Sequence, residues 1–181
     1  MIITGIGSRE TPALVLAEMQ QIGIWCHGHG IWVRSGHAQG ADYAFEAGAQ
    51  ESCITYEPWR NFNDGKLERT RAQVCIPEDQ EWMRELVRLF HPAPDKLSEG
   101  AMKLMMRNGC QLFGRKGPDM PVNTHSQAVV CWTSDGEDVG GTSQALRIAR
   151  AYQIPILNMG LHEWNAASKV IAYLENMLAH S

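Results

Sequence analysis

The sequence predicts an α/β fold in which helices cover both faces of a mainly parallel sheet. Short apolar runs alternate with longer amphipathic segments along most of the 181 residues. This alternation is typical of parallel strands that are joined by right-handed helical crossovers. Hydrophobic residues make up 44% of the chain and charged residues 20%, so the chain can bury a core without disulfides or a metal. We expect one domain over residues 1–181.

The first part of the chain contains three expected strands and two expected helices. Thr11 and Pro12 predict a helix start, because threonine is a common N-cap and proline suits the first helical turn. Glycines follow the first helix and the second strand, where the chain must turn. The expected elements are a strand at 1–5, a helix at 13–27, a strand at 31–35, a helix at 41–50 and a strand at 53–56.

Residues 59–125 are expected to form a mostly helical insertion within this domain. A helical period of apolar residues runs from Pro77 to Phe90, and the prolines at 91–94 end it. A methionine-rich helix is expected at 97–112, with more apolar surface than a small insertion can bury. The alternation then resumes with a strand at 128–132, a helix at 142–152, a strand at 154–158 and a helix at 164–178.

Charge and cysteine content argue against several classes of protein, although a local basic patch that binds nucleic acid stays open. Sixteen Lys+Arg against twenty Asp+Glu give a formal net charge of −4, whereas a protein that binds DNA through its overall field is normally basic. The five cysteines lie far apart and form no CxxC pair, so we expect no disulfide framework, no metal site and a cytoplasmic location. No signal peptide is evident, and the apolar stretch at 13–25 is too short to span a membrane.

Three glycine-bearing loops stand where an expected strand ends and a helix begins, at residues 5–9, 35–42 and 140–143. Ligands bind at the carboxyl ends of strands in an open parallel sheet, and the free N–H groups of a helix N-terminus favour an anion. Glycines there allow the backbone to approach a ligand closely. The sequence therefore predicts a phosphate-bearing ligand. Its expected contacts are Gly5, Gly7, Ser8, Arg9, Ser35, Gly36, Gly40, Asp42, Gly140, Gly141, Thr142 and Ser143.

Other candidate residues have a functional and a structural interpretation. Asp42 and Glu46 are one helical turn apart, so they would contact a ribose or act as a general acid or base; alternatively, Asp42 stabilises the helix N-terminus. Trp59 follows the third strand, where it would stack on a base or pack the insertion onto the sheet. Glu10 interrupts a GxGxxG pattern and no P-loop lysine follows, which argues against Walker-type ATP hydrolysis.

Two of these loops resemble those of a known family. The run Gly7-Ser8-Arg9-Glu10-Thr11-Pro12 and the later Ser35-Gly36-His37-Ala38-Gln39-Gly40-Ala41-Asp42 resemble the G-S-R-x-x-T-type and S-G-x-A-x-G-x-D loops of the DprA/Smf DNA-processing proteins. Gly140-Gly141-Thr142 looks like the glycine-threonine loop of the LOG phosphoribohydrolases, and Met105-Met106-Arg107-Asn108 looks like their arginine-lysine segment. The chain thus resembles the Smf/DprA–LOG (SLOG) superfamily. This resemblance implies a Rossmann-like three-layer α/β/α sandwich, nucleotide-type ligands and a homodimer.

The chain departs from the motifs of both the LOG and the DprA/Smf proteins, and these departures decide the order of the functional hypotheses. LOG enzymes carry a glutamate three residues after the loop threonine, where this chain has Ala145, and Asn108 stands in place of their lysine. Binding of a nucleotide without turnover is therefore the first hypothesis, with no required cofactor. One alternative is a LOG-like N-glycosidase that uses Glu46 or Asp42 together with Arg107. The other is a DprA-like single-stranded DNA-binding recombination factor, against which Gln39 and the net charge argue.

Overall fold

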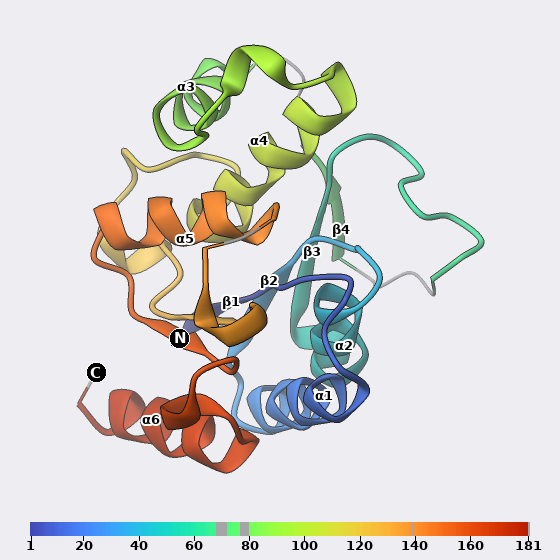
Figure 1. The fold of residues 1–181 in the computed structure, drawn as a ribbon. Coiled ribbons are helices and arrows are strands. Elements are labelled where there is room, and N and C mark those ends of the chain that lie inside the picture. The colour runs from blue at the N-terminus through green and yellow to red at the C-terminus, as the bar shows by residue number, and fades with distance from the viewer. Residues whose placement is uncertain (68–71, 77–79, 139, 181) are drawn as a thin grey trace.

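The computed structural model describes residues 1–67, 72–76, 80–138 and 140–180. Within these ranges six strands form one parallel sheet in the order β4-β3-β2-β1-β5-β6 (Figure 1). The strands are β1 (Ile2–Gly5), β2 (Trp32–Ser35), β3 (Cys53–Glu57), β4 (Ala72–Cys75), β5 (Val129–Cys131) and β6 (Ile156–Asn158). The predicted parallel α/β fold is confirmed.

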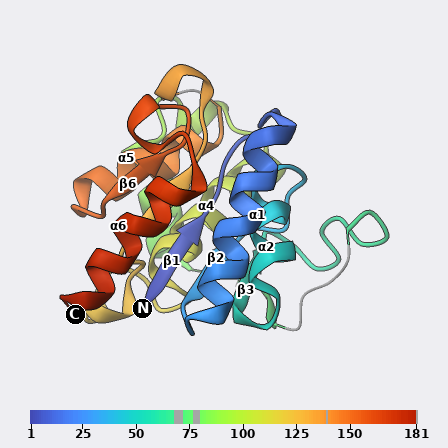
Figure 2. The ribbon, with the colours of Figure 1, turned by 90° about the horizontal axis from the view of Figure 1, so that it is seen from below.

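Helices cover both faces of this sheet, which gives three layers. They are α1 (Ala13–Gly28), α2 (Ala41–Ala49), α3 (Glu81–Phe90), α4 (Glu99–Phe113), α5 (Thr142–Ala151) and α6 (Ala167–Ala179). Figures 1 and 2 show α1, α2 and α6 on one face, while α3, α4 and α5 lie on the other. None of the helices in the described ranges is long and apolar enough to cross a membrane.

The strand order creates a switch point beside β1. The chain adds β2, β3 and β4 to one side of β1 and then returns to place β5 on its other side, with Thr4 opposite Val129. The crossovers after β1 and after β5 therefore leave toward opposite faces of the sheet. Such a point opens a crevice at the carboxyl ends of the two strands, where ligands bind in open α/β sheets.

The alternation of side chains along β5 shows how the two faces are filled. Val130 packs in the cluster under α1, α2 and α6, whereas Val129 and Cys131 pack in the cluster against α4 and α5. All three are fully buried, as expected for a strand that is covered on both faces. Burial of each large apolar side chain stabilises the fold by roughly 1.5–3 kcal/mol, so these two clusters hold the strand ends, and the loops after them, in place.

The region 59–125 contains the two expected helices, α3 and α4, and also a strand that was not expected. It contributes the edge strand β4, which pairs with β3, and its helix α4 packs across β1, β2 and β3. The part of this region that follows β4, with α3 and α4, is the crossover that returns the chain from β4 to β5. The helix predicted from Pro77 begins at Glu81 in the structure, and residues 77–79 lie outside the described ranges.

Candidate functional site

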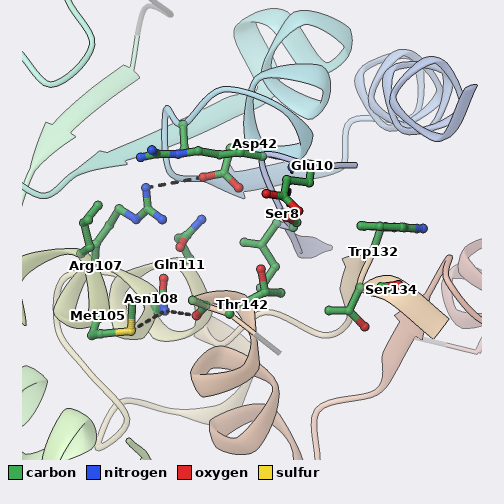
Figure 3. Close-up of a pocket in the computed structure, with 18 residues that line it drawn as sticks. Ser8, Glu10, Asp42, Met105, Arg107, Asn108, Gln111, Trp132, Ser134 and Thr142 are labelled. Atoms are coloured by element: carbon green, nitrogen blue, oxygen red, sulfur yellow. Dashed lines mark hydrogen bonds and ion pairs between the residues drawn. The ribbon is translucent and has the colours of Figure 1, made fainter. Parts of the chain in front are cut away.

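A cavity of about 690 Å³ lies at the carboxyl ends of β1 and β5. Its walls come from the loop after β1, the first turn of α2, one face of α4, the loop after β5 and the N-terminus of α5 (Figure 3). The lining residues are Ile6, Gly7, Ser8, Arg9, Glu10, Ala38, Asp42, Leu104, Met105, Arg107, Asn108, Gln111, Trp132, Thr133, Ser134, Gly140, Gly141 and Thr142.

The structure brings parts of all three glycine-bearing loops to this cavity. Gly7, Ser8 and Arg9 line it from the first loop, Asp42 lines it from the second, and residues 140–142 line it from the third. Arg107 joins them from α4. Gly5, Ser35, Gly36, Gly40, Glu46, Trp59 and Ser143 are outside the lining.

Ser35 and Ser143 bond to backbone rather than to the cavity. The Ser35 hydroxyl donates to the carbonyl of Gly5 at 3.0 Å and to that of Asp42 at 3.1 Å. The Ser143 hydroxyl donates to the Gly140 carbonyl at 2.7 Å. The Ser143 hydroxyl also accepts from Arg147 Nη1 at 3.2 Å. These two serines therefore fix the shape of the loops, and their contact with a ligand stays a prediction.

Gly36 and Gly40 allow the loops to pack against their neighbours. Arg107 Nη1 donates to the Gly36 carbonyl at 2.5 Å, and a Cβ on Gly36 would lie 2.5 Å from the guanidinium carbon. Gly40 has φ +90°, and a Cβ there would lie 2.7 Å from the Ser8 carbonyl oxygen. Their small size thus lets the second loop pack against α4 at Gly36 and against the loop after β1 at Gly40, while their contact with a ligand stays a prediction.

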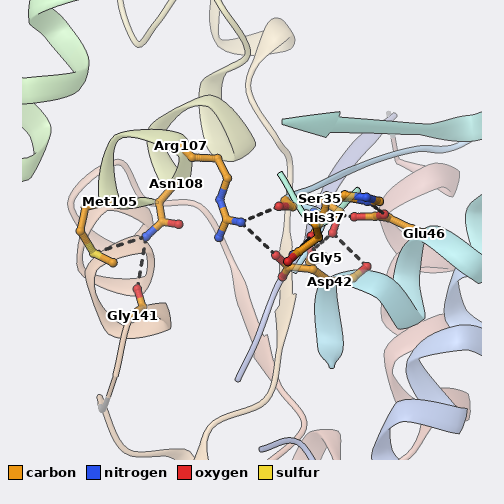
Figure 4. Close-up of polar contacts among 11 residues, drawn as sticks. Gly5, Ser35, His37, Asp42, Glu46, Met105, Arg107, Asn108 and Gly141 are labelled. Atoms are coloured by element: carbon orange, nitrogen blue, oxygen red, sulfur yellow. Dashed lines mark hydrogen bonds and ion pairs between the residues drawn. The ribbon is translucent and has the colours of Figure 1, made fainter. Parts of the chain in front are cut away.

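Asp42 and Arg107 form a buried ion pair at the inner side of the cavity. Asp42 Oδ2 lies 3.5 Å from Arg107 Nη1 (Figure 4). Burial raises the pKa of Asp42 to about 6, and the negative charge of Glu46 contributes to this rise, while Arg107 and the N–H groups of Ala38 and Gly7 oppose it. Burial also lowers the pKa of Arg107. Burial therefore disfavours the ionised form of both groups at the cavity, relative to the same groups in water.

Glu46, the other candidate acid, turns away from the cavity. Its carboxylate accepts the backbone N–H of His37 at 2.6 Å, and its second oxygen lies 2.8 Å from His37 Nδ1. Both side chains are fully buried (Figure 4). His37 has φ 55°, a conformation that few residues with a side chain adopt. The Glu46 carboxylate holds this loop in shape.

The candidate Trp59, and Ala145, which replaces the LOG glutamate, both lie in packing environments. Trp59 is 37% exposed and packs edge-on against Phe62 with ring centroids 5.0 Å apart. Ala145, at the position of the LOG glutamate, is buried in the core between α5 and the sheet. No cluster of three or more metal-ligating side chains occurs among residues that the structure describes.

Leu104, Gln111 and Trp132 line the cavity although their sequence neighbourhoods do not single them out. Leu104 and Gln111 lie on α4, three and four residues from Arg107 and on its face of the helix. Of these three residues, Arg107 is the one that the sequence predicts for the site. A helical projection from Arg107 identifies Gln111, one turn later on the same face. Trp132 directly follows β5 and lies opposite the α4 side chains in Figure 3.

Comparison with known proteins identifies the fold but not a family. No family model matches the sequence, and no curated protein matches it. DNA processing protein A of Helicobacter pylori, described as binding single-stranded DNA, is similar with a TM-score of 0.54 and 14% identity, over 97% of this chain and 72% of that one. The Moco carrier protein of Chlamydomonas is similar with a TM-score of 0.56 and 14% identity, over 98% and 97%.

Proposed function

We propose that the protein binds a phosphate-bearing nucleotide in the cavity between β1 and β5, and that it belongs to the SLOG superfamily. The convergence of the loop after β1 and the N-terminus of α5 on one cavity carries this proposal. The cavity lies at the switch point of the sheet, where such folds bind ligands. Two arginines, Arg9 and Arg107, line it and supply positive charge. The superfamily assignment rests on the loop motifs and on the shared fold.

The phosphate is assigned to the N-terminus of α5. This helix has no side-chain cap and no acidic residue in its first turn, so its N–H groups and dipole favour an anion. The N-terminus of α2 is different, because Asp42 already places a carboxylate in its first turn. Gly140, Gly141 and Thr142 would hold the phosphate from one side, and Ser8 and Arg9 from the other.

Filling the space at Gly141 tests this position. Gly141 is exposed on the cavity wall, whereas Gly100 in α4 lies outside the cavity lining and has open space where a Cβ would stand. We expect Gly141→Leu to weaken binding of nucleoside monophosphates by tenfold or more in calorimetry, while Gly100→Leu leaves it unchanged. Wild-type affinity in a folded Gly141→Leu protein would refute the phosphate position. Absence of binding for all nucleoside monophosphates would refute the function.

Hydrolysis of an N-glycosidic bond is the second candidate function, and Asp42 favours it. A carboxyl group with a pKa of about 6 beside a cavity is suited to general acid-base catalysis near neutral pH. Neither Glu46, which bonds to His37, nor Ala145 supplies a second carboxylate to the cavity, whose other carboxylate is that of Glu10 in the loop after β1. Release of free base from nucleoside monophosphates, abolished in Asp42→Asn, would establish this activity. Binding without release over hours would leave a binding protein.

A DprA-like role with single-stranded DNA and a homodimeric state are separate proposals. The similar Helicobacter protein supports the first, while the net charge of −4 argues against it. Oligonucleotide binding that weakens with salt would support it.

The proposal of a homodimer rests on the superfamily resemblance alone. Met106 is in the core and Met105 lines the cavity, so the methionines of α4 leave less apolar surface for a dimer interface than expected. The solution mass at micromolar concentration tests it.

A further inference from the structure

Gln111 presents an unused amide at the cavity. The residue lies in the last turn of α4, is fully buried and belongs to the cavity lining. Its backbone carbonyl is fixed, because it accepts hydrogen bonds from Thr4 Oγ1 at 2.7 Å and from Ser126 Oγ at 3.1 Å. Its side-chain Oε1 and Nε2, in contrast, have no hydrogen-bond partner in the described ranges.

Two neighbouring side chains share this property. Arg107 Nε and Asp42 Oδ2 are also buried without a hydrogen bond to any described residue. Arg107 and Gln111 are one turn apart on the same face of α4, and Asp42 lies across from Arg107 at 3.5 Å (Figure 3). The inner wall of the cavity therefore offers donors and acceptors that lack a hydrogen bond to described residues, although Asp42 Oδ2 keeps its ion pair with Arg107.

Asn108 provides a contrast on the same helix. It lies next to Arg107, but its Nδ2 donates to Gln144 Oε1 at 2.8 Å and to the Gly141 carbonyl at 3.2 Å. Folded proteins satisfy most buried side-chain polar atoms, since an unsatisfied one costs free energy. Single unbonded polar atoms also occur away from the cavity, at Arg34, His125 and Gln144, but the cavity wall gathers three such side chains at one place, where a ligand would complete their bonds.

We infer that Gln111 binds the hydrogen-bonding edge of a nucleobase, an inference that rests on the proposed nucleotide function. A glutamine amide offers a donor and an acceptor side by side, and it pairs with a base edge that carries an acceptor beside a donor, as adenine does. Being neutral, the amide adds little to phosphate binding. Leu104, Met105 and Ile6 line the same cavity and give apolar surface for the faces of a planar ring.

The test compares ligands with and without a base. Affinities for AMP, GMP, CMP, UMP and ribose 5-phosphate are measured by calorimetry for wild type and for Gln111→Met, which keeps an unbranched side chain. We expect wild type to bind at least one of the nucleotides, AMP first, tenfold or more tighter than ribose 5-phosphate. Gln111→Met should bring this ratio close to one and leave the affinity for ribose 5-phosphate unchanged.

Gln144→Met provides the matched control. Gln144 is an equally buried glutamine outside the cavity lining. Its Nε2 lacks a hydrogen bond to a described residue, as in Gln111, but its Oε1 accepts one from Asn108. We expect its replacement to lower the melting temperature and to keep the base preference, while Gln111→Met loses the preference and keeps or raises the melting temperature. If Gln111→Met does not fold, Gln111→Leu replaces it.

The outcomes separate the two proposals. If neither the nucleotides nor ribose 5-phosphate bind, the proposed function and this inference both fail. If ribose 5-phosphate binds as tightly as every nucleotide, or if Gln111→Met retains the wild-type ratio, the role of Gln111 is refuted while phosphate binding stands.

Discussion

Asp42 Oδ2 and Arg107 Nη1 lie 3.5 Å apart and join the first turn of α2 to α4 across the inner side of the cavity. The separation is longer than that of a charge-assisted hydrogen bond, which is about 2.7–2.9 Å. Both groups are buried, and burial disfavours the charge of each. The protonation of Asp42 therefore changes the charge of the inner wall of the cavity.

The first prediction concerns the pH dependence of stability at Asp42. Burial raises its pKa to about 6 in the folded protein, above the ordinary value of 3.8, so the folded state loses stability as the pH rises between these two values. We expect the free energy of unfolding of Asp42→Asn, relative to wild type, to increase by about 1–2 kcal/mol between pH 5 and pH 7.5. Urea unfolding at both pH values measures it, and parallel profiles would contradict the buried ionisable carboxyl.

The second prediction removes the other member of the pair. In Arg107→Met the Asp42 carboxylate loses its positive neighbour, and the Gly36 carbonyl loses its donor. Removing one partner of a buried ion pair typically costs about 3–5 kcal/mol. We expect a loss of this order at pH 7.5 and a smaller loss at pH 5, where Asp42 is protonated. Urea unfolding at both pH values checks it, and an equal loss at both would show that the ion pair contributes nothing.

The third prediction uses the close contact at Gly36. A methyl group there would lie 2.5 Å from the Arg107 guanidinium and 2.7 Å from Asp42 Oδ2, so Gly36→Ala must displace the ion pair. We expect nucleotide affinity to fall tenfold or more while the protein remains folded. Gly100→Ala, in open space on α4, is the control and should bind as wild type. Calorimetry on the two variants checks this, and equal affinities would argue that Arg107 has no part in binding.

The fourth prediction assigns Glu46 to stability. Its carboxylate bonds to the backbone and ring of His37 and does not line the cavity. We expect Glu46→Gln to lower the free energy of unfolding by about 1–3 kcal/mol, because charge-assisted hydrogen bonds are weakened, and to keep nucleotide affinity within twofold. Urea unfolding and calorimetry measure the two effects. Lost binding with unchanged stability would restore Glu46 as a ligand-contacting residue.

The fold could be predicted from the sequence because its signals are local. The apolar runs at Ile2–Gly5 and Val129–Cys131 are short and buried. The Thr11-Pro12 pair marks the helix start to within a residue, but its expected capping is wrong: Pro12 is the N-cap, the helix begins at Ala13, and the Thr11 hydroxyl donates to the Ser8 carbonyl at 2.7 Å instead of capping the helix. The strand Ala72–Cys75 could not be recognised, because a short run with a polar residue at the edge of a sheet has no periodicity. Only its pairing with β3 identifies it.

The site could be predicted in part, for the same physical reason. The loops at Gly7 and Gly141 carry local glycine patterns and do line the cavity. The direction of the Glu46 side chain depends on His37, which adopts a rare backbone conformation that sequence does not reveal. The role of Gln111 depends on which bonds its neighbours leave unmade, and this is a property of the packed interior.

The return of the chain from β4 to β5 has a consequence for the order in which the protein forms. The walls of the cavity come from the loop after β1, one face of α4 and the N-terminus of α5, and these segments lie far apart in the sequence. During translation they therefore leave the ribosome at different times. A nascent chain that ends before Thr142 lacks one of these walls, however well its first strands pair. The proposed ligand can therefore bind only after α4, β5 and the N-terminus of α5 have docked. A ligand added during refolding should accelerate none of the steps that precede the docking of β5 on β1.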